Sequence, residues 1–325
     1  MRILVTGASG FVGRVLCPEL VARGASVRVA LRSPVRSSAE ACERVVVGDI
    51  DSRTDWTEAL QGVDCVLHLA ARAHILDQSR GGPQPYFDTN ALGTHRLAQA
   101  AVRAGVKRLV YLSSIKVNGE GRDAAYLATD TPQPMDAYGT SKWQGEQHLH
   151  EIAAASSMEA VVIRSPLVYG PQVRANFLRL MKWVDKGVPL PLGAVRNRRS
   201  IVSVWNLADL LYTCVSSPAA AGGTFMVSDS VDLSTPELIR RIGVAMDRRV
   251  RLIPVPVLAL RAAGALLGRR ADIERLCGSL AVELGPTCAT LSWRPPHTIE
   301  SALGRTVEWY LKAGRDAPIE AATAV

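Results

Sequence analysis

The sequence predicts an α/β fold in which a doubly wound parallel sheet is combined with a smaller, interleaved C-terminal domain. Two observations predict it. Short apolar runs rich in β-branched residues recur along the first part of the chain, and segments long enough for crossover helices separate them. From about residue 165 this alternation gives way to helices and to loops marked by Pro and Gly. Continuous apolar runs are typical of parallel strands that helices cover on both faces.

The expected elements follow in chain order. Strands are predicted at residues 3–5, 27–31, 45–47, 65–69, 109–113, 161–164 and 225–227, and helices at residues 10–23, 85–104 and 137–156. The strand at 225–227 is expected to rejoin the main sheet, so the domains interleave. The larger domain is predicted to hold residues 1–165 and 198–230, and the smaller one residues 166–197 and 231–316, with 317–325 as a disordered, Ala-rich tail.

Composition bounds the function only loosely. The chain has 325 residues, 48% hydrophobic and 21% charged, which is ordinary globular usage. Its net charge of +8 favours acidic partners such as nucleotides, phosphorylated substrates or a membrane surface, although scattered arginines from a GC-rich genome would give the same excess. The apolar stretch 252–267 contains two prolines and an arginine and is too short to span a membrane, so we expect a helix on the substrate side of the fold.

Cysteines and the N-terminus indicate a reduced, cytoplasmic protein. The six cysteines are widely spaced, with no C-x-x-C pair and no His-rich cluster, so no metal site is expected. The chain begins directly with a strand pattern rather than with a charged leader and an apolar segment. We therefore expect a cytoplasmic location.

A glycine-rich turn follows the first strand. Residues 6–13 read Thr-Gly-Ala-Ser-Gly-Phe-Val-Gly and open a helix, so Gly7, Gly10 and Gly13, with Phe11 and Val12, are expected to hold a dinucleotide. Glycines allow a tight turn and a close approach of the backbone to the pyrophosphate, whose charge faces the helix N-terminus. This context predicts a Rossmann-type cofactor site.

The second strand bears on which dinucleotide binds. NAD enzymes usually place a carboxylate about 20 residues after the glycines, but none lies between Glu19 and Glu40. Arg32 ends the strand instead and could pair with a 2′-phosphate, so NADP(H) is favoured and NAD(H) stays the alternative. Asp49 and Ile50 after the third strand are expected near the adenine. Further cofactor contacts are predicted at Leu69, Ala70 and Ala71 after the fourth strand, whereas His68 is expected to be a core histidine.

Three residues form the predicted chemical site. Tyr138 and Lys142 lie four residues apart on one predicted helix face. Tyrosine has a pKa of about 10, which a neighbouring ammonium and an oxidised nicotinamide are expected to lower. Ser113 and Ser114 end the strand 109–113, at the sheet edge where ligands bind in doubly wound folds. Ser114 can therefore hydrogen-bond the substrate oxygen that Tyr138 protonates.

These segments together resemble the extended short-chain dehydrogenase/reductase family, which includes nucleotide-sugar epimerases, dehydratases and reductases. The resemblance covers nearly the whole chain, through residues 6–13, 49–50, 67–71, 90–94, 112–119, 138–142, 164–171 and 291–295. It implies that Ser114, Tyr138 and Lys142 are catalytic, with Tyr138 and Lys142 also touching the cofactor. It further implies that Asn90, Ser113 and Pro166 border the cofactor and that Ser114, Lys116, Asn176, Leu190, Leu192 and Arg199 border the nucleotide sugar, expected to be a UDP-sugar.

Departures from the family pattern narrow the chemistry. Sugar 4,6-dehydratases carry an Asp-Glu pair where this chain has Ile115 and Lys116, so dehydration is disfavoured. Leu167 stands where many epimerases have Asn. Residues 113–120, 174–177 and 189–200 are similar to bacterial 4-ketoreductases, which act on UDP-2-acetamido-2,6-dideoxy-hexos-4-ulose in surface polysaccharide synthesis. An NADPH-dependent reductase of this kind is the leading hypothesis.

Two alternatives stay open. A UDP-sugar 4-epimerase would use the same residues with a retained NAD. A non-catalytic dinucleotide sensor or an RNA-binding relative would need no Tyr/Lys pair, and because aromatic and basic residues do not interleave here, no nucleic-acid partner is expected. The resemblance also implies a possible homodimer, paired through the helices 85–104 and 137–156.

Overall fold

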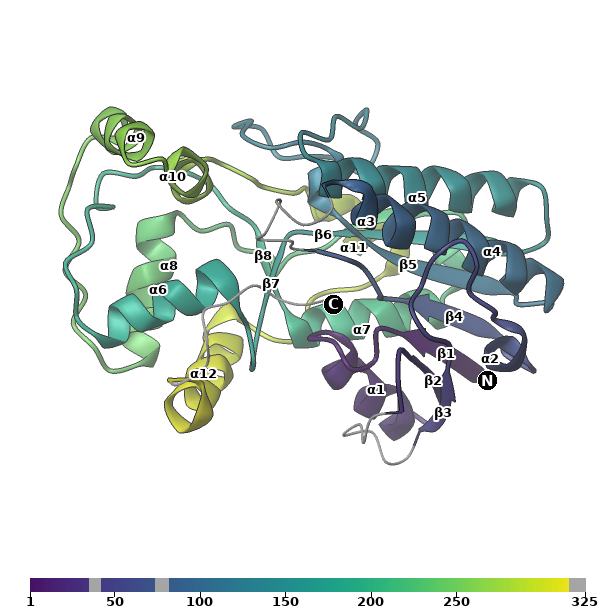
Figure 1. Cartoon of the computed structure of the whole chain (residues 1–325). Coiled ribbons are helices and arrows are strands. Elements are labelled where there is room, and N and C mark those ends of the chain that lie inside the picture. Colours follow the sequence, from purple (N-terminus) through teal and green to yellow (C-terminus); the bar gives the residue numbers. More distant parts are fainter. Residues whose placement is uncertain (35–41, 74–81, 316–325) are drawn as a thin grey trace.

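The protein is built around one large parallel sheet. The computed structural model describes residues 1–34, 42–73 and 82–315, and Figure 1 shows the sheet with helices on both sides. The strand order is β3-β2-β1-β4-β5-β6-β9, with every pair parallel. The strands are β1 (Arg2–Thr6), β2 (Ser26–Leu31), β3 (Glu43–Val46), β4 (Cys65–His68), β5 (Arg108–Ser114), β6 (Glu159–Ser165) and β9 (Thr224–Met226). The predicted α/β class is confirmed, and the late strand rejoins the sheet beside β6.

Alternate side chains of each strand pack on opposite faces of the sheet. In β1, Ile3 and Val5 belong to the core beneath α1 (Gly13–Ala22) and α7 (Val204–Ser216), whereas Leu4 belongs to the core on the other side. That second core packs against α4 (Thr94–Arg103) and α5 (Ala137–Ala154), which carry Leu97 and Leu149 into it. Both faces are buried, which explains why the strands have no alternation of apolar and polar residues.

The helical segment predicted at 85–104 is interrupted by a wide turn. It consists of α3 (Gln84–Phe87), the π-helical stretch η1 (Asp88–Gly93) and α4 in direct succession. Single π turns occur frequently at functional sites, and this one contains Asn90. The remaining short helices near the sheet are α2 (Thr57–Leu60) and η2 (Ile115–Val117).

The region beyond β6 forms the second part of the molecule. Helices α6 (Ala175–Asp185), α8 (Thr235–Ala245), α9 (Val257–Leu266), α10 (Arg270–Cys277) and α12 (Ile299–Trp309) gather on one side of the sheet's carboxyl edge, as Figure 1 shows. The short strands β7 (Leu167–Tyr169) and β8 (Ile201–Ser203) pair in parallel between the two parts. The sequence did not predict this two-stranded sheet, because three-residue strands carry little pattern. The other elements are η3 (Pro218–Ala220), α11 (Gly285–Leu291) and η4 (Tyr310–Gly314).

Three sequence-based expectations concern the ends and the surface of the fold. The stretch 252–267 contains the predicted helix as α9, which packs against α10. The predicted tail at 317–325 lies outside the described residues, and the division into domains stays a prediction. In the described part of the chain, none of the helices has both the length and the hydropathy needed to cross a bilayer.

Candidate active site

Helix α5 brings the predicted acid/base residues onto one face. Asp136 caps its N-terminus by accepting a hydrogen bond from the Gly139 N–H at 2.7 Å. Tyr138 and Lys142 then follow one turn apart. Ser114 ends β5 opposite them, and its hydroxyl is hydrogen-bonded to the Tyr138 side chain. The structure therefore places the three predicted catalytic side chains at the carboxyl edge of the sheet.

The surroundings of Tyr138 raise the pKa of its phenol. Burial raises the pKa of its phenol to about 12, and the nearby Asp136 carboxyl and Tyr86 ring act in the same direction, while the hydrogen bond with Ser114 opposes them. Among the protein's own groups, the loss of solvation around the phenolate outweighs the stabilising contacts. The lowering of this pKa by Lys142 together with an oxidised nicotinamide stays a prediction.

Lys142 is almost completely buried, with 1% of its surface exposed. Its Nζ donates to the Leu112 carbonyl at 2.7 Å and lies 3.9 Å from the centre of the Tyr111 ring. Burial lowers the pKa of this amine to about 7, although the Glu146 carboxylate acts to raise it. At neutral pH the ammonium is therefore close to its titration point, where small changes nearby alter its charge.

A buried ion pair supports this face of the helix. Glu146 lies one turn beyond Lys142 and is fully buried, and its Oε2 contacts Arg164 Nη2 of β6 at 2.7 Å. Ser113 donates a short hydrogen bond to Glu146 Oε1, and Arg164 also donates to the Asn118 side chain at 3.1 Å. Glu146 is not among the residues that the motifs predict, although its spacing of four residues from Lys142 is a visible signal.

His68 is a core residue, as the sequence predicted. Thr6 Oγ1 lies 2.7 Å from its Nδ1 and Thr94 Oγ1 3.0 Å from its Nε2, and the ring stacks on Tyr111. Burial lowers the pKa of the imidazole to about 3, helped by the charge of Lys142. The ring is therefore neutral at working pH and links β1, β4 and α4.

The glycine-rich turn fits a dinucleotide pyrophosphate. Gly7 has a φ of +70°, and a Cβ there would lie 2.7 Å from the Ala70 nitrogen, while a Cβ on Gly13 would lie 2.4 Å from the Gly7 carbonyl oxygen. Only glycine allows this packing of the turn between β4 and α1. No side chain caps the N-terminus of α1, and its first turn has no acidic residue. The N–H groups and the helix dipole there suit an anionic ligand.

Several predicted cofactor residues line the same edge of the sheet. Ala70 donates its N–H to Thr6 Oγ1 at 3.2 Å, which fixes the chain where it leaves β4. The others that lie at strand ends or in the glycine turn are Gly10, Phe11, Val12, Ile50, Leu69, Ala71, Ser113 and Pro166. Their positions agree with a cofactor lying across the strand ends, although their contacts with it stay a prediction.

Arg32 and Asp49, which we expected at different parts of the cofactor, contact each other. Arg32 Nε lies 2.8 Å from Asp49 Oδ1, and both side chains are exposed. In the sequence, no carboxylate stands at the end of the second strand. The fold supplies one there, because Asp49 from the segment after β3 lies beside Arg32. The carboxylate partly cancels the positive charge of the arginine and so weakens its attraction for a phosphate.

Asn90 is placed to support the backbone. It is 1% exposed, its Oδ1 accepts from the Arg72 N–H at 2.8 Å, and its Nδ2 donates to the Arg72 carbonyl and to Ser141 Oγ, both at 3.0 Å. Its carbonyl accepts from Thr94 Oγ1 and from the Tyr111 hydroxyl. The side chain thus connects the segment after β4 to α5. In the protein it is a buried structural residue, and its proximity to the cofactor stays a prediction.

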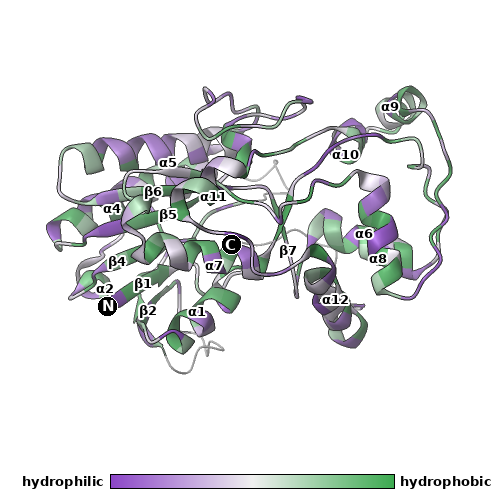
Figure 2. Ribbon diagram, turned by 180° about the vertical axis from the view of Figure 1, so that it is seen from behind, coloured by the Kyte–Doolittle hydropathy of each residue, from purple (hydrophilic) through white to green (hydrophobic). Residues whose placement is uncertain are grey.

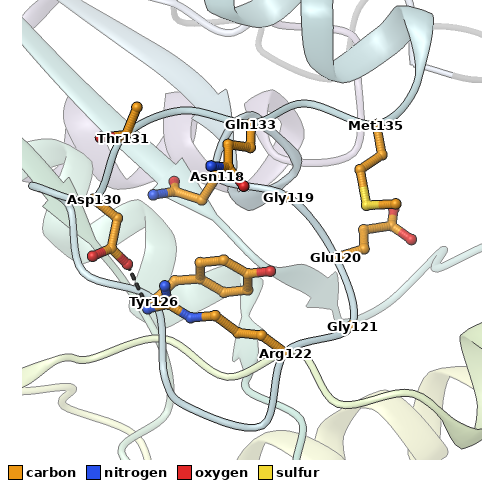
Figure 3. Close-up of a pocket in the computed structure, with 10 residues that line it drawn as sticks. All are labelled: Asn118, Gly119, Glu120, Gly121, Arg122, Tyr126, Asp130, Thr131, Gln133 and Met135. Carbon is orange, nitrogen blue, oxygen red and sulfur yellow. Dashed lines mark hydrogen bonds and ion pairs between the residues drawn. The ribbon is translucent and has the colours of Figure 1, made fainter.

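A cavity of about 450 Å³ lies beside the end of β5. Figure 3 shows its lining between the loop after η2 and the approach to α5, with the Arg122 guanidinium stacked over the Tyr126 ring at 4.1 Å and paired with Asp130. Lys116, predicted as a substrate contact, is held at the edge of this region by Glu120 and Asp136, each at 2.5 Å. The two carboxylates occupy two of its three donors and reduce its charge toward an anionic substrate.

The predicted substrate residues of the smaller part are spread over several elements. Asn176 is partly exposed at the start of α6. Leu190 and Leu192 are 6% and 3% exposed because both belong to the hydrophobic core. The predicted contact of these two residues with the nucleotide sugar stays a prediction.

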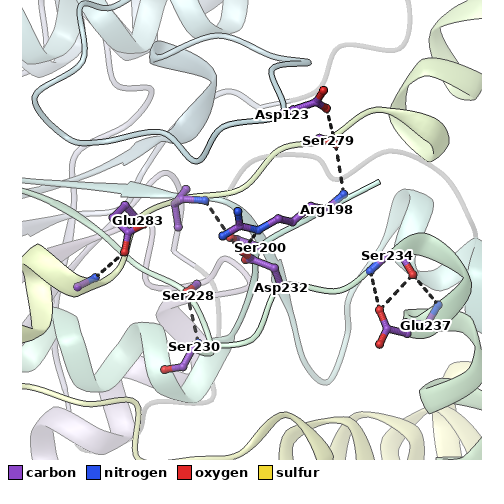
Figure 4. A network of polar contacts seen from close by, with 12 residues as sticks. Asp123, Arg198, Ser200, Ser228, Ser230, Asp232, Ser234, Glu237, Ser279 and Glu283 are labelled. Carbon is purple, nitrogen blue, oxygen red and sulfur yellow. Dashed lines mark hydrogen bonds and ion pairs between the residues drawn. The ribbon is translucent and has the colours of Figure 1, made fainter. Parts of the chain in front are cut away.

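Arg199 lies between the cavity and the loop after α10. Its Nη1 donates to the carbonyls of Arg275 and Gly278 at 3.0 and 2.9 Å. Burial lowers the pKa of its guanidinium, while the nearby Glu120 acts to raise it. Next to it, Arg198 pairs with Asp232, and Ser200 hydrogen-bonds the same carboxylate, as Figure 4 shows. Among the described residues, no group of three or more His, Cys, Asp or Glu could hold a metal ion.

The fold is that of a dinucleotide-dependent enzyme of the short-chain dehydrogenase/reductase type. The model of the NAD dependent epimerase/dehydratase family matches residues 3–227, and the chain belongs to this family. It is thus an enzyme of that family, as its motifs predicted.

Relatives and solved structures agree with this assignment. The chain is 41% identical to the UDP-glucose 4-epimerase of Vibrio cholerae, over 96% of both chains. It is 26% identical, over 97% of both, to N-acetyl-alpha-D-glucosaminyl-diphospho-ditrans,octacis-undecaprenol 4-epimerase of Escherichia coli O157:H7. The UDP-glucuronic acid 4-epimerase of Bacillus cereus, solved with NAD, has the same fold, with a TM-score of 0.77, 20% identity and coverage of 96% of this chain and 99% of that one.

Proposed function

We propose that the protein is a UDP-sugar 4-epimerase that works with a retained NAD. The observation that supports this most is the 41% identity, over nearly the whole of both chains, to a UDP-glucose 4-epimerase. The grouping of Ser114, Tyr138 and Lys142 supplies the acid/base residues that such a reaction needs. An epimerase oxidises the C4 hydroxyl of the sugar and reduces the ketone again on its other face.

Tyr138 would move the proton in both half-reactions. A nicotinamide held at this edge of the sheet would supply the acceptor and donor for the C4 hydride. In the oxidation, the C4–H bond breaks as the hydroxyl proton passes to the phenolate oxygen of Tyr138, and in the reduction this oxygen gives the proton back. Ser114 would hold the same sugar oxygen. Because burial raises the pKa of Tyr138 to about 12, the phenolate needs the positive charges of Lys142 and of the oxidised ring beside it.

The contact between Arg32 and Asp49 supports NAD over NADP. A 2′-phosphate would have to compete with the Asp49 carboxylate for the guanidinium, whereas a ribose 2′-hydroxyl can donate to that carboxylate. This differs from the preference that the second strand alone suggests. Arg199 and Asn176 are the proposed contacts of the UDP diphosphate, and pairing of two copies through α4 and α5 stays a prediction.

A second candidate is the NADPH-dependent 4-ketoreductase of a UDP-2-acetamido-2,6-dideoxy-hexos-4-ulose. Arg32 at the end of β2 favours it, because an exposed arginine can exchange Asp49 for a phosphate. In that reaction Tyr138 acts only as an acid, which agrees with its raised pKa. Hydride and proton then pass once, and the cofactor must leave.

Cofactor retention separates the two candidates. The purified protein is denatured to release any nucleotide, and the intact protein is incubated with UDP-glucose, UDP-galactose and their N-acetylated forms without added cofactor, with NMR to follow both epimers. We expect bound NAD and interconversion of at least one pair. A nucleotide-free protein that interconverts none of them, but oxidises NADPH with the 4-keto sugar nucleotide, would replace the epimerase by the reductase.

A further inference from the structure

Helix α9 turns an apolar face to the outside. Leu258, Ala262, Ala265 and Leu266 follow the spacing i, i+4, i+7 and i+8, which places them along one side of the helix, and all are exposed. Leu258 is 77% and Leu266 89% exposed. A helix on a protein surface normally directs such a stripe inward.

The opposite side of α9 already has its packing partner. Leu260 is buried, and Gly264 lies so close to Ile273 of α10 that a Cβ would come within 2.6 Å of it. The outward stripe is therefore additional to the contacts that hold the helix in the fold. Figure 2 shows α9 as a largely green helix at the periphery, distant from the sheet.

The same segment carries a concentrated positive charge. Residues 248–270 include six arginines and no Asp or Glu, which accounts for much of the net charge of +8. Arg248 is paired with Asp185 and Arg261 with Glu274 from neighbouring elements. Arg269 and Arg270 come directly after the helix and are exposed. Exposed leucines are thus bordered by arginines, so the face combines apolar and cationic groups.

We propose that α9 docks the protein on the surface of an anionic phospholipid bilayer. Leu258 and Leu266 would enter the boundary between headgroups and acyl chains, while Arg269 and Arg270 would reach the lipid phosphates. Arginine can do this while its aliphatic stem stays on apolar surface. The helix would lie on the membrane rather than cross it.

Charge complementarity favours a bilayer over a second copy of the chain. In a two-fold contact through α9, the arginines of one copy would face those of its partner, and like charges at close range oppose association. A surface of anionic lipids offers negative charge along the whole length of the helix. The active-site residues lie at the sheet edge on α5 and β5, so docking at α9 leaves them in place.

Vesicle co-sedimentation of the full chain tests the proposal. Vesicles of phosphatidylcholine alone are compared with vesicles of phosphatidylcholine and phosphatidylglycerol. We expect binding to the mixed vesicles at least about tenfold tighter, weakening as salt is raised. The double variants Leu258→Ser/Leu266→Ser and Arg269→Gln/Arg270→Gln should each weaken it about tenfold or more.

Two matched controls remove similar groups elsewhere. Val244→Ser deletes an apolar side chain that is 82% exposed on α8, and Arg53→Gln deletes an exposed arginine near α2; both should bind the mixed vesicles like the parent protein. Thermal unfolding checks that every variant is folded. If the double leucine variant is unfolded, the double arginine variant decides whether α9 binds the vesicles.

Three results would overturn the proposal: absence of binding to the mixed vesicles, equal binding to both kinds, or binding that neither α9 variant reduces. If sedimentation velocity showed a dimer that Leu258→Ser/Leu266→Ser converts to a monomer, without vesicle binding, the face would be an interface between copies instead. Binding needs no substrate, so the result is independent of the proposed activity.

Discussion

The inner face of α5 and the loop around Arg198 hold their charged groups in different ways. At the carboxyl edge of the sheet, Lys142, Glu146 and Arg164 are buried and held by fixed partners. In the part beyond β6, ion pairs such as Arg198–Asp232 lie at the surface. Buried networks that are fully satisfied are rigid, whereas exposed pairs contribute little and rearrange easily. The chemical groups are thus positioned in advance, and the substrate side can adapt to a ligand.

Substitution of Tyr138 by Phe should have the largest effect. The ring keeps its packing but loses the phenolic oxygen that we propose exchanges a proton with the substrate, so turnover should fall about 10²- to 10⁴-fold. The thermal unfolding midpoint should hardly change. Tyr212→Phe, which removes a hydroxyl from a ring on α7, is the control and should keep near-normal activity. Near-normal turnover by the Tyr138 variant would exclude it from the chemistry.

Substitution of Glu146 by Gln should affect stability and the pH profile together. It leaves Arg164 buried without its charge partner, which costs about 3–5 kcal/mol in chemical denaturation. It also removes the carboxylate that raises the pKa of Lys142, so the amine should lose its proton at lower pH. If the ammonium is needed, the alkaline decline of kcat/KM should move to lower pH. Glu146 is a positioning residue in this account, since it acts through Lys142.

Two further variants separate these effects. Glu151→Gln removes an exposed carboxylate from the same helix and should change neither property. Combining Glu146→Gln with Arg164→Gln removes the unpaired charge, so stability should be partly regained while the pH profile stays shifted. If the pH profile of kcat/KM in the double variant returned to that of the parent protein as stability was regained, Glu146 would have only a structural role.

Substitution of Arg199 by Gln should have the smallest effect. Its guanidinium is the proposed diphosphate contact on the adaptable side, so the KM for the UDP-sugar should rise several-fold with kcat changed less than about threefold. Cofactor affinity should stay the same. Arg198→Gln, next in the chain but turned toward Asp232, is the control. A large loss of kcat would show that the two sides are less distinct than we infer.

The sequence predicted the elements whose signal is local. Most strands of the large sheet contain a continuous apolar run, the glycine turn follows the first of them, and Tyr138 and Lys142 share one helix. The partners missed lie far apart in the chain. Glu146 meets Arg164 across α5 and β6, and Asp49 reaches Arg32 from another strand, so their pairing depends on tertiary structure.

Local motifs identify the residue types of a site but do not predict how far each side chain is buried. The pKa of Tyr138 rises because the partly exposed ring loses part of its solvation to neighbouring protein groups, which its spacing from Lys142 does not reveal. The resemblance places Leu190 and Leu192 near the nucleotide sugar, but it does not reveal that both side chains belong to the hydrophobic core. The short strands β7 and β8 are specified by packing between the two parts rather than by propensity.

The wide turn η1 also bears on how this chain can vary. A helix with a π turn contains one residue more than a regular α-helix of the same course, and the irregularity costs local stability. Here the extra residue sets Asn90 against Arg72 and Ser141 while α4 still packs on the sheet. Deletion of one residue from 88–93 would convert the π turn into regular α-helix. Asn90 would then be rotated around the helix axis, away from Arg72 and Ser141. The length of this segment is therefore constrained together with the identities of Asn90 and Gly93, and we expect a one-residue deletion to disrupt the contacts of Asn90.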